Sequence, residues 1–281
     1  YMAVLLIPNI TKDQGLVVTR RAAEILQQLH VPVLVPDYGI HWQLSGVTVL
    51  PEEQAYRQAD QVLTIGGDGT LLRSGHSCVR YGKPVLGVNL GRTGFLATCE
   101  VEELPDKLPL LAQGDYSLEK RGLLCAVAAD GAWQMRAIND IVVFGETRMH
   151  PMDYRVYCDG AFVSSYRSDG LILATPTGST AYSFSAGGPV LDGAADVMSL
   201  TPVCAHNVHT APLVFAASRT LEIVADSENR DRCYACADSG PQNILLPGQK
   251  MKVTAAPEKL QLITFQESEQ FCAIENKLMR R

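Results

Sequence analysis

The sequence lacks the features of membrane-spanning and nucleic-acid-binding chains. No apolar run approaches the roughly 20 residues that a helix needs to span a bilayer, and the first residues have neither the basic start nor the small-residue cleavage site of a signal peptide. Lys and Arg number 24 against 30 Asp and Glu, a net charge of −6, whereas broad nucleic-acid capture needs basic residues gathered on one face. We therefore expect a cytoplasmic protein with a small-molecule ligand and with no nucleic-acid or membrane partner.

The cysteines do not form the framework of a disulfide-rich secreted chain. There are eight, scattered along the sequence, and reduced thiols are the expected state. Cys233 and Cys236 form a CxxC motif, but no second pair or nearby histidine completes a zinc site. We predict no metal-ligating residues, and the less favoured alternative is a redox or metal role for this pair.

The first third of the chain alternates strand-like and helix-like segments. The strand-like segments are short continuous apolar runs, at 2–8, 32–36, 47–50, 61–65 and 84–88. Such runs are typical of strands buried in a parallel sheet. Thr11 and Gln14 have the spacing of a capping box ahead of the first helical segment. This alternation predicts an α/β domain with a doubly wound parallel sheet.

The pattern changes from about residue 118 to short alternating strands. Asp-Gly pairs at 130–131 and 159–160 interrupt strand-like runs, which is a strong hairpin signal because both central turn positions must accept positive φ. We therefore predict three segments: an α/β domain over 1–105, a mainly antiparallel β domain over 106–255, and a strand and helix over 256–281 that return to the first domain.

The stretch "GGDGT", residues 66–70, lies directly after the apolar strand 61–65. Ligands of open α/β sheets bind at the carboxyl ends of the strands. Glycines let backbone N–H groups approach phosphate oxygens, and the helix that opens near Thr70 adds its positive dipole end. We predict that Gly66, Gly67, Gly69 and Thr70 bind phosphate, although the loop has no P-loop lysine.

Asp68 is a carboxylate within this predicted phosphate loop. It would repel the ligand unless it had a chemical role, and two roles suit it: accepting a proton from an attacking hydroxyl, or holding Mg²⁺. A turn in which the aspartate bonds to local backbone is almost equally compatible with the spacing alone.

A second polar stretch, "TPTGSTAYSFSAGGP" at 175–189, follows another apolar strand. By itself it could be a Ser/Thr-rich turn. Together with "GGDGT" it resembles the NAD kinase family over nearly the whole chain. The resemblance is also carried by "NLGRTGFL" (89–96), "IND" (138–140), "RSDG" (167–170) and "LTPVCAH" (200–206). "GGDGT" is shared with lipid kinases and phosphofructokinases, whereas "TPTGSTAY" is far more specific.

The resemblance implies phosphorylation of NAD at the 2′-hydroxyl of the adenosine ribose to make NADP, with ATP or polyphosphate as donor and a divalent cation, Mg²⁺, as cofactor. Asp68 matches the catalytic, proton-accepting aspartate of that family. The family's assembly implies a homodimer or homotetramer. NAD and the phosphoryl donor are the expected partners.

The resemblance also implies which residues bind NAD. Asn139 and Asp140 match a pair that grips the adenosine portion, Asp169 matches a carboxylate that receives the nicotinamide amide, and Arg167 is placed to meet a phosphate. The remaining NAD-binding matches are Gly67, Gly69, Leu72, Phe95, His150, Thr177, Thr180, Ala181, Tyr182, Ser183, Phe184, Ser185 and His206. Leu72 and Phe95 could each be core residues instead, and without the resemblance this is the favoured account of Leu72. His150 could equally be a turn or surface residue.

Two alternatives and two departures accompany this interpretation. A lipid kinase would keep "GGDGT" but have little use for the polar tract at 175–189, and a non-catalytic dinucleotide sensor would gain nothing from Asp68. Ala205 stands where the family often has proline, and "DSGPQ" (238–242) replaces a "DGQ"-like segment. These departures concern the nicotinamide end, and hence the preference for NAD or NADH, more than the reaction class.

Overall fold

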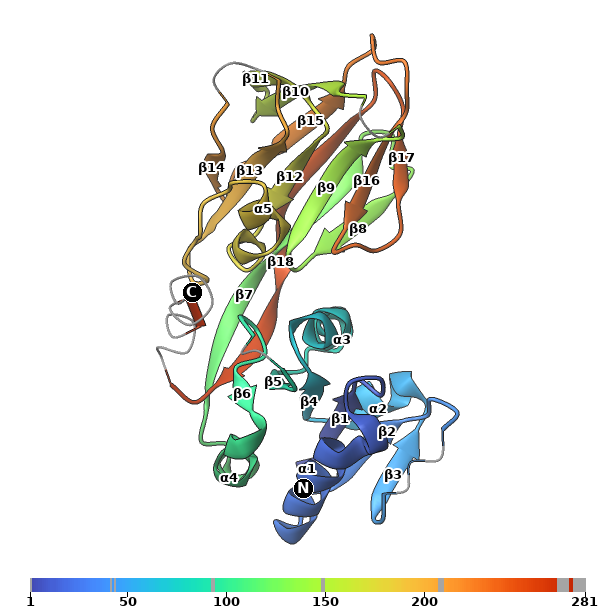
Figure 1. Cartoon of the computed structure of the whole chain (residues 1–281), viewed down its shortest axis with the longest axis vertical. Coiled ribbons are helices and arrows are strands. Elements are labelled where there is room, and N and C mark those ends of the chain that lie inside the picture. The colour runs from blue at the N-terminus through green and yellow to red at the C-terminus, as the bar shows by residue number, and fades with distance from the viewer. Residues whose placement is uncertain are drawn as a thin grey trace. The chain divides into compact units, whose positions relative to one another are not determined.

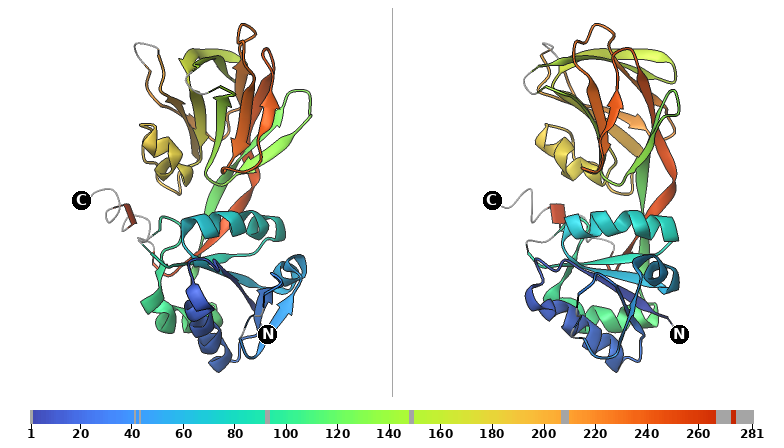
Figure 2. Two further views of the ribbon diagram at one scale, coloured as in Figure 1. Left: turned by 45° about the vertical axis from the view of Figure 1, so that its right-hand side comes forward. Right: turned by 90° about the vertical axis from the view of Figure 1, so that its right-hand side faces the viewer.

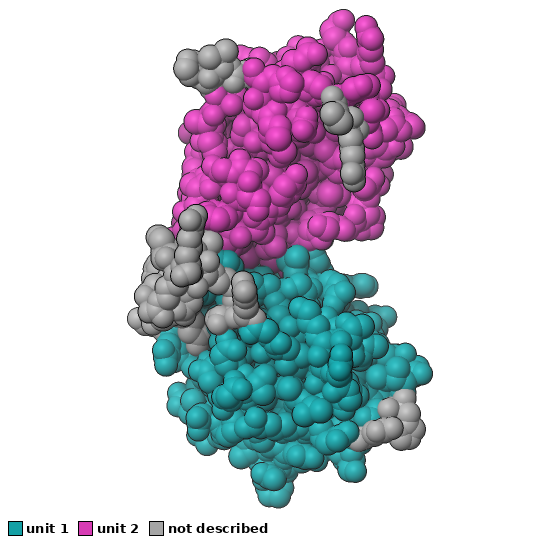
Figure 3. Space-filling view, viewed as in Figure 1, with its two compact units in different colours: residues 1–120, 260–281 teal, residues 121–259 magenta. Residues whose placement is uncertain are grey.

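The computed structural model describes residues 2–40, 42, 44–91, 94–147, 150–206, 210–266 and 273–274. The chain forms two compact units, the first made of residues 1–120 and 260–281 and the second of residues 121–259 (Figure 3). The sequence placed the corresponding boundaries at 105/106 and 255/256. Unit 1 therefore extends through the helix after residue 103 and into the strand that follows it.

The sheet of unit 1 is parallel. Its strands lie in the order β3, β2, β1, β4, β5 and β18 (Figure 1). The strands are β1 (Val4–Pro8), β2 (Val33–Pro36), β3 (Val47–Leu50), β4 (Gln61–Gly66), β5 (Val85–Asn89) and β18 (Lys250–Thr264), with the short β6 (Cys99–Glu100) beside β5. The residues of β1, β4 and β5 are all buried, as their continuous apolar runs require. The predicted doubly wound parallel sheet is confirmed.

Helices cover both faces of this sheet (Figure 2). They are α1 (Val17–Gln28), α2 (Glu52–Gln58), α3 (Asp68–Tyr81) and α4 (Leu104–Gln113), with the 3₁₀ turns η1 (Gln14–Leu16) and η2 (Val101–Glu103). Leu26 of α1 and Leu108 of α4 share one buried cluster with Val4 and Leu6 of β1. Because side chains alternate along a strand, Leu5, which lies between Val4 and Leu6, faces the other side of the sheet.

The capping box predicted from Thr11 and Gln14 is wrong. Thr11 donates its hydroxyl to Asn9 Oδ1 at 2.6 Å, and the start of α1 is capped by Asp13. The carboxylate of Asp13 accepts the backbone N–H groups of Val18 at 3.0 Å and Thr19 at 2.9 Å. The spacing was misleading because Gln14 begins the 3₁₀ turn η1, which comes between Thr11 and the helix.

Unit 2 contains two antiparallel sheets. One has the order β11, β10, β15, β18 with β7 and β8 attached, and the other has the order β14, β13, β12, β9, β16, β17. The strands are β7 (Ser117–Ala128), β8 (Gln134–Ala137), β9 (Asp140–Gly145), β10 (Met152–Cys158), β11 (Ala161–Ser168), β12 (Gly170–Ala174), β13 (Val197–Val203), β14 (Leu213–Ala216), β15 (Leu221–Ala225), β16 (Cys233–Ala237) and β17 (Asn243–Leu245). One buried cluster joins side chains of both sheets, including Tyr154, Leu171 and Met251. The predicted mainly antiparallel second domain is confirmed.

Both predicted Asp-Gly hairpins are present. β7 pairs with β8 across residues 130–131, and β10 pairs with β11 across Asp159 and Gly160, whose φ angles are 49° and 82°. β18 passes from unit 2 into unit 1, where Leu262 lies opposite Val85 of β5. The helix predicted after β18 lies outside the described residues except for 273–274. No helix in the described ranges is long and apolar enough to cross a membrane.

Candidate active site

The glycine loop of unit 1 joins β4 to α3 through a conformation that only glycine adopts readily. Gly67 has φ 138° and ψ −174° and is the residue before the first helical position, Asp68. Its carbonyl accepts the N–H groups of Thr70 at 2.9 Å and Leu71 at 3.1 Å. The first N–H groups of a helix have no partner within it and favour an anion. The loop thus has the geometry of a phosphate site at the carboxyl end of β4.

Asp68 is held by the segment that follows β5. Its Oδ2 accepts the N–H of Phe95 at 2.8 Å, and its Oδ1 accepts the N–H groups of Leu96 at 3.0 Å and Ala97 at 2.9 Å. Three backbone donors from consecutive residues satisfy and orient a carboxylate. The alternative for Asp68 was a turn in which its carboxylate bonds to neighbouring backbone. These three contacts instead join the carboxylate to a distant segment of the chain.

Gly94 makes this arrangement possible. A β-carbon at position 94 would collide with the Asp68 carboxylate and would lie 2.8 Å from the carbonyl oxygen of Ala97. The backbone of residue 94 therefore packs directly against the carboxyl group. Phe95 and Leu72, the two apolar residues matched to the dinucleotide, are both partly buried in this unit.

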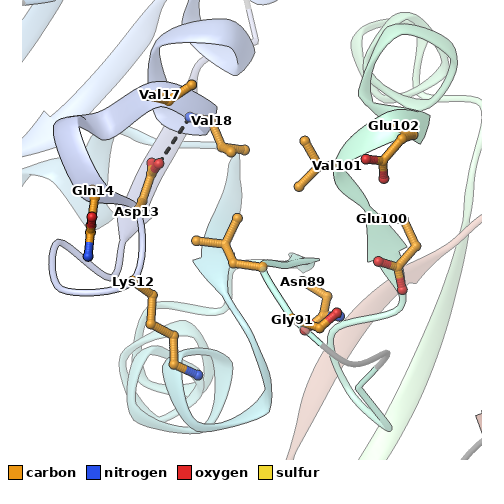
Figure 4. Close-up of a pocket in the computed structure, with 11 residues that line it drawn as sticks. Lys12, Asp13, Gln14, Val17, Val18, Asn89, Gly91, Glu100, Val101 and Glu102 are labelled. Atoms are coloured by element: carbon orange, nitrogen blue, oxygen red, sulfur yellow. Dashed lines mark hydrogen bonds between the residues drawn. The ribbon is translucent and has the colours of Figure 1, made fainter.

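A cavity of about 530 Å³ lies beside the glycine loop within unit 1 (Figure 4). It is lined by Lys12, Asp13, Gln14, Val17, Val18, Asn89, Leu90, Gly91, Glu100, Val101 and Glu102. The Nζ atom of Lys12 is 3.8 Å from the place that a β-carbon on Gly67 would take, and Asn89 Oδ1 is 3.4 Å from it. Lys12 thus brings to the loop the positive charge that the loop's own sequence lacks. Sequence reasoning missed it because the loop after β1 carries no phosphate motif.

In unit 2, the segment 138–140 is held by its backbone. Asp238 accepts the N–H groups of Ile138 at 2.7 Å, Asn139 at 2.8 Å and Asp140 at 3.1 Å. On the carbonyl side, Thr175 donates its hydroxyl to Ile138 at 2.6 Å and its N–H to Asn139 at 2.9 Å. The Asp140 carbonyl accepts the N–H of Asp238 at 3.0 Å. Every backbone polar group of the three residues is therefore bonded, so distant residues fix the conformation of this segment.

Gly178 explains why glycine stands within the "TPTGST" tract. A β-carbon at position 178 would collide with the backbone of Asn139. The tract begins where β12 ends, and Ala174 of β12 lies opposite Asp140 of β9. The start of the tract is consequently brought against the Asn139–Asp140 pair.

The hydroxyls of this tract mostly hold the tract itself together. Ser179 donates to the Pro176 carbonyl at 2.6 Å, Thr180 donates to the Thr177 carbonyl at 3.2 Å, and Ser183 is bonded to the Thr201 hydroxyl at 2.9 Å. Ser183 is fully buried, so it supports the turn from inside. Tyr182 and Phe184 are exposed by 48% and 41%. Thr177 is buried, Ala181 is partly buried and Ser185 is exposed.

Four other predicted NAD contacts lie toward the opposite end of the same strands. Asp169 precedes β12, whereas Thr175 follows it, and at about 3.3 Å per residue these two positions are roughly 20 Å apart. His206 and Arg167 lie beside Asp169, and the His206 N–H donates to the Arg167 carbonyl at 2.8 Å. His150, beyond the end of β9, is exposed, and its Nδ1 is 3.3 Å from Asp231 Oδ2. The structure thus groups the matched residues of unit 2 at two ends of the sheet.

Asp140 is a buried carboxyl group with a second carboxylate nearby. Burial is the main cause that raises its pKa, and the negative charge of Asp238 raises it further, to about 7. Asp140 is only 7% exposed. Its charge therefore changes near neutral pH, unlike that of an exposed aspartate.

The two cysteines of the CxxC motif lie on β16, where Cys233 is buried and Cys236 is partly buried. Cys233 is fully buried on β16, and burial raises the pKa of its thiol to about 11. Seven cysteines of the described residues are free, and Cys272 lies outside them. Within the described ranges, no group of three or more His, Cys, Asp or Glu side chains could hold a metal ion.

Unit 1 has a parallel sheet with a glycine loop at its carboxyl edge and a carboxylate fixed at the helix start, and in unit 2 a polar tract packs against the Asn139–Asp140 pair. These features are typical of a phosphotransferase that handles nucleotides. Comparison with known proteins gives the family. The ATP-NAD kinase N-terminal domain matches residues 4–116, and the ATP-NAD kinase C-terminal domain matches residues 138–265. The chain belongs to the NAD kinase family, whose members phosphorylate NAD to NADP and use ATP as phosphoryl donor.

Individual relatives agree over most of the chain. An NAD kinase of Chlorobium phaeovibrioides is 31% identical over 275 residues, which are 97% of this chain and 96% of the relative. An NAD kinase of Pseudomonas putida is 33% identical over 92% of this chain and 88% of its own. A yeast NADH kinase solved in complex with NADH has a TM-score of 0.83 at 25% identity and covers 99% of this chain and 87% of that one. An NAD kinase from Archaeoglobus fulgidus, with a TM-score of 0.77 at 24% identity over 98% of both chains, shares the fold.

Proposed function

We propose that the protein transfers the terminal phosphoryl group of ATP to the 2′-hydroxyl of the adenosine ribose of NAD, with Asp68 as the proton acceptor. The observation that carries the proposal is the Asp68 carboxylate, fixed by three backbone N–H groups at the start of α3. The ribose oxygen attacks the terminal phosphorus, its proton passes to the carboxylate, and ADP leaves. A carboxylate that is already oriented needs little reorganisation during the reaction.

The adenosine portion of NAD is proposed to bind unit 2 at Asn139 and Asp140. A carboxylate can accept both hydrogens of a ribose diol, and an Asn amide can both donate to and accept from an adenine edge. The polar tract supplies the neighbouring contacts, at Thr177, Thr180, Ala181, Tyr182, Phe184 and Ser185, with Ser183 as an internal support. The nicotinamide end is proposed to bind Asp169, Arg167, His206 and His150, and the apolar contacts are Leu72 and Phe95.

The donor phosphates are proposed to bind the glycine loop of unit 1. Gly66, Gly67, Gly69 and Thr70 surround the start of α3, whose dipole favours anions. Lys12 adds a full positive charge next to Gly67 and lines the adjoining cavity together with Asn89. Phosphate recognition by a lysine acting as a point charge is common in nucleotide sites.

A divalent cation, Mg²⁺, is proposed to accompany the donor. Mg²⁺ usually binds through substrate phosphates and water together with one or two carboxylates, so the donor phosphates at the glycine loop would supply its main ligands, and Asp68 keeps the role of proton acceptor. When bound, the cation would neutralise charge on the phosphates. Removing divalent cations with a chelator should stop NADP formation reversibly, and full activity in chelator would exclude the cation.

The assembly is proposed to be a symmetric homodimer or homotetramer in the cytoplasm. Support for assembly comes from exposed apolar side chains of unit 2, among them Phe162, Val214 and Ile244. Support for a reducing compartment comes from the seven free cysteines. Sedimentation of the purified protein would distinguish a monomer, a dimer and a tetramer.

The decisive experiment is a phosphorylation assay with NAD, ATP and Mg²⁺, with NADP detected by an NADP-specific dehydrogenase. The Asp68→Asn variant is assayed in parallel. NADP made by the wild type and not by the variant supports the reaction and its proton acceptor together. If no NADP forms, even with polyphosphate as donor or NADH as acceptor, the protein binds dinucleotide without phosphorylating it, and the sensor alternative takes its place.

A further inference from the structure

We propose that Asp238 is a positioning residue that holds segment 138–140 in the conformation that presents Asn139 and Asp140 to NAD. The inference rests on the proposed function, because it assigns to Asp238 the arrangement of that NAD site. Asp238 has no contact with the ligand in this scheme and acts only through its neighbours.

Asp238 is joined to segment 138–140 by hydrogen bonds of both its carboxylate and its backbone N–H. One carboxylate accepts three consecutive backbone N–H groups, at 2.7, 2.8 and 3.1 Å, and the N–H of Asp238 donates to the Asp140 carbonyl at 3.0 Å. Charge-assisted bonds of this kind are about twice as strong as neutral ones. Asp238 is separated from the segment that it holds by 98 to 100 residues along the chain. These hydrogen bonds therefore depend on the tertiary fold and not on a local turn.

The turn that carries Asp238 supports the same role. The Gly240 N–H donates to the Ala237 carbonyl at 2.7 Å, and the two residues between them, Asp238 and Ser239, have φ angles of 49° and 58°. Such a turn ordinarily selects asparagine, aspartate or glycine, because these residues accept positive φ most readily. An aspartate therefore suits this turn, and its carboxylate is available to segment 138–140.

The charges around Asp140 make the role of Asp238 measurable. The negative charge of Asp238 raises the pKa of Asp140, and both carboxylates raise the pKa of the Cys236 thiol on β16, after burial. Arg136 of β8 is paired with Glu258 at 3.0 Å. Segment 170–180 has no ionisable side chain, and Tyr182, the first residue of the short helix α5 (Tyr182–Ser185), is half-exposed. A change at Asp238 should therefore alter the protonation of Asp140 as well as its position.

The test compares NADP formation by the wild type, Asp238→Asn and a matched control, Asp159→Asn, as a function of pH. Asparagine tolerates positive φ, so the turn at 238 is retained. Asp159 is matched because it also has φ 49° and its carboxylate also accepts a backbone N–H from a distant segment, that of Thr220 at 2.9 Å. It lies in the β10–β11 turn, outside the proposed binding residues.

The expected result has two parts. In Asp238→Asn the KM for NAD rises about tenfold or more while kcat changes much less, because the binding pair is misplaced and the proton acceptor Asp68 is untouched. The inflection of kcat/KM for NAD, near pH 7 in the wild type, moves to lower pH because the negative charge beside Asp140 is gone. Asp159→Asn keeps both the wild-type KM and the wild-type inflection.

Three results would overturn the proposal. An active, folded Asp238→Asn with an unchanged KM and an unchanged inflection removes the positioning role while leaving the proposed function intact. A wild type that makes no NADP removes the proposed function and the role with it. Should Asp238→Asn fail to fold, hydrogen exchange of the wild type decides: amides of 138–140 as slow as those of β9 support the role, and fast exchange overturns it.

Discussion

The carboxylate of Asp68 occupies the space that a side chain at Gly94 would need. The two residues come from different loops of unit 1, one after β4 and the other after β5. Because β4 and β5 are adjacent parallel strands, their carboxyl ends meet at one edge of the sheet, and the backbone of 94–97 closes around the carboxylate. The orientation of the proposed proton acceptor therefore depends on a glycine that has no chemistry of its own.

Gly94→Ala should lower kcat by about a hundredfold, since a misplacement of about 1 Å in a catalytic group has an effect of that size. NAD binding, measured by calorimetry, should change much less than kcat, because Asn139 and Asp140 are in the other unit and only the neighbouring Phe95 is a proposed dinucleotide contact in this segment. Gly122→Ala is the control: its β-carbon would lie 3.5 Å from the flexible end of Lys259, and kcat should be retained. Equal kcat in Gly94→Ala and the wild type would show that Asp68 needs no such support.

Asp68→Asn should destabilise the protein as well as abolish turnover. Both carboxylate oxygens accept backbone N–H groups, from Phe95 on one side and from Leu96 and Ala97 on the other. An asparagine has only one accepting oxygen, so its NH₂ must face at least one N–H donor. The free energy of unfolding, measured in urea, should fall by about 1–3 kcal/mol.

The exposed Asp115 is the comparison for this loss of stability. Asp115→Asn should leave the free energy of unfolding within about 0.5 kcal/mol of the wild type. If Asp68→Asn is as stable as Asp115→Asn, the three amide contacts contribute nothing to folding.

Lys12→Ala should raise the KM for ATP about tenfold or more and leave the KM for NAD nearly unchanged. The reason is that Lys12 supplies positive charge next to Gly67 in unit 1, whereas the proposed NAD contacts of Asn139 and Asp140 are in unit 2. Steady-state kinetics with each substrate varied in turn separates the two effects.

Lys83→Ala removes the same charge from the same unit and serves as the control. Lys83 follows α3 and its Nζ lies 3.4 Å from the Arg57 carbonyl, at the surface. Its KM for ATP should equal that of the wild type. A similar rise in both variants would point to net charge rather than to a contact at Gly67.

Asp140→Asn should stabilise the ligand-free protein more at pH 8 than at pH 5. Burial, and then the charge of Asp238, raises the pKa of Asp140 from 3.8 to about 7. Between these two values the folded state binds the proton that the unfolded state has released, so this group lowers the stability as the pH rises through that window. Above pH 7 the Asp140 carboxylate is charged in the folded state, and the full destabilisation is present. The uncharged amide of an asparagine at this position causes none of it.

Urea unfolding at both pH values measures the effect. The gain in unfolding free energy from Asp140→Asn should be larger at pH 8 than at pH 5 by more than about 1 kcal/mol. A pKa shift of less than one unit already produces a difference of that size. A gain that is the same at both pH values would show that Asp140 does not titrate within this window.

The sequence alone was enough to predict the elements and the class of site. Continuous apolar runs predicted the parallel strands of unit 1, and the Asp-Gly pair at 159–160 predicted its hairpin. The glycine loop and Asp68 were recognised from local spacing. The Thr11–Gln14 capping box was wrong, because the spacing cannot reveal that the 3₁₀ turn η1 begins at Gln14 and precedes α1.

The contacts that complete the candidate site were decided by tertiary structure. The amides that hold Asp68, the lysine beside Gly67 and the carboxylate that holds 138–140 come from segments far away in the sequence. Their proximity depends on the order and register of strands in a sheet, which bring loops together at a strand's end. The sequence by itself determined which segments form strands, helices and turns and which family chemistry is present, since those depend on local patterns. Only the fold decided which distant backbone groups and charges surround Asp68 and Asp140, because pairing between strands sets those distances.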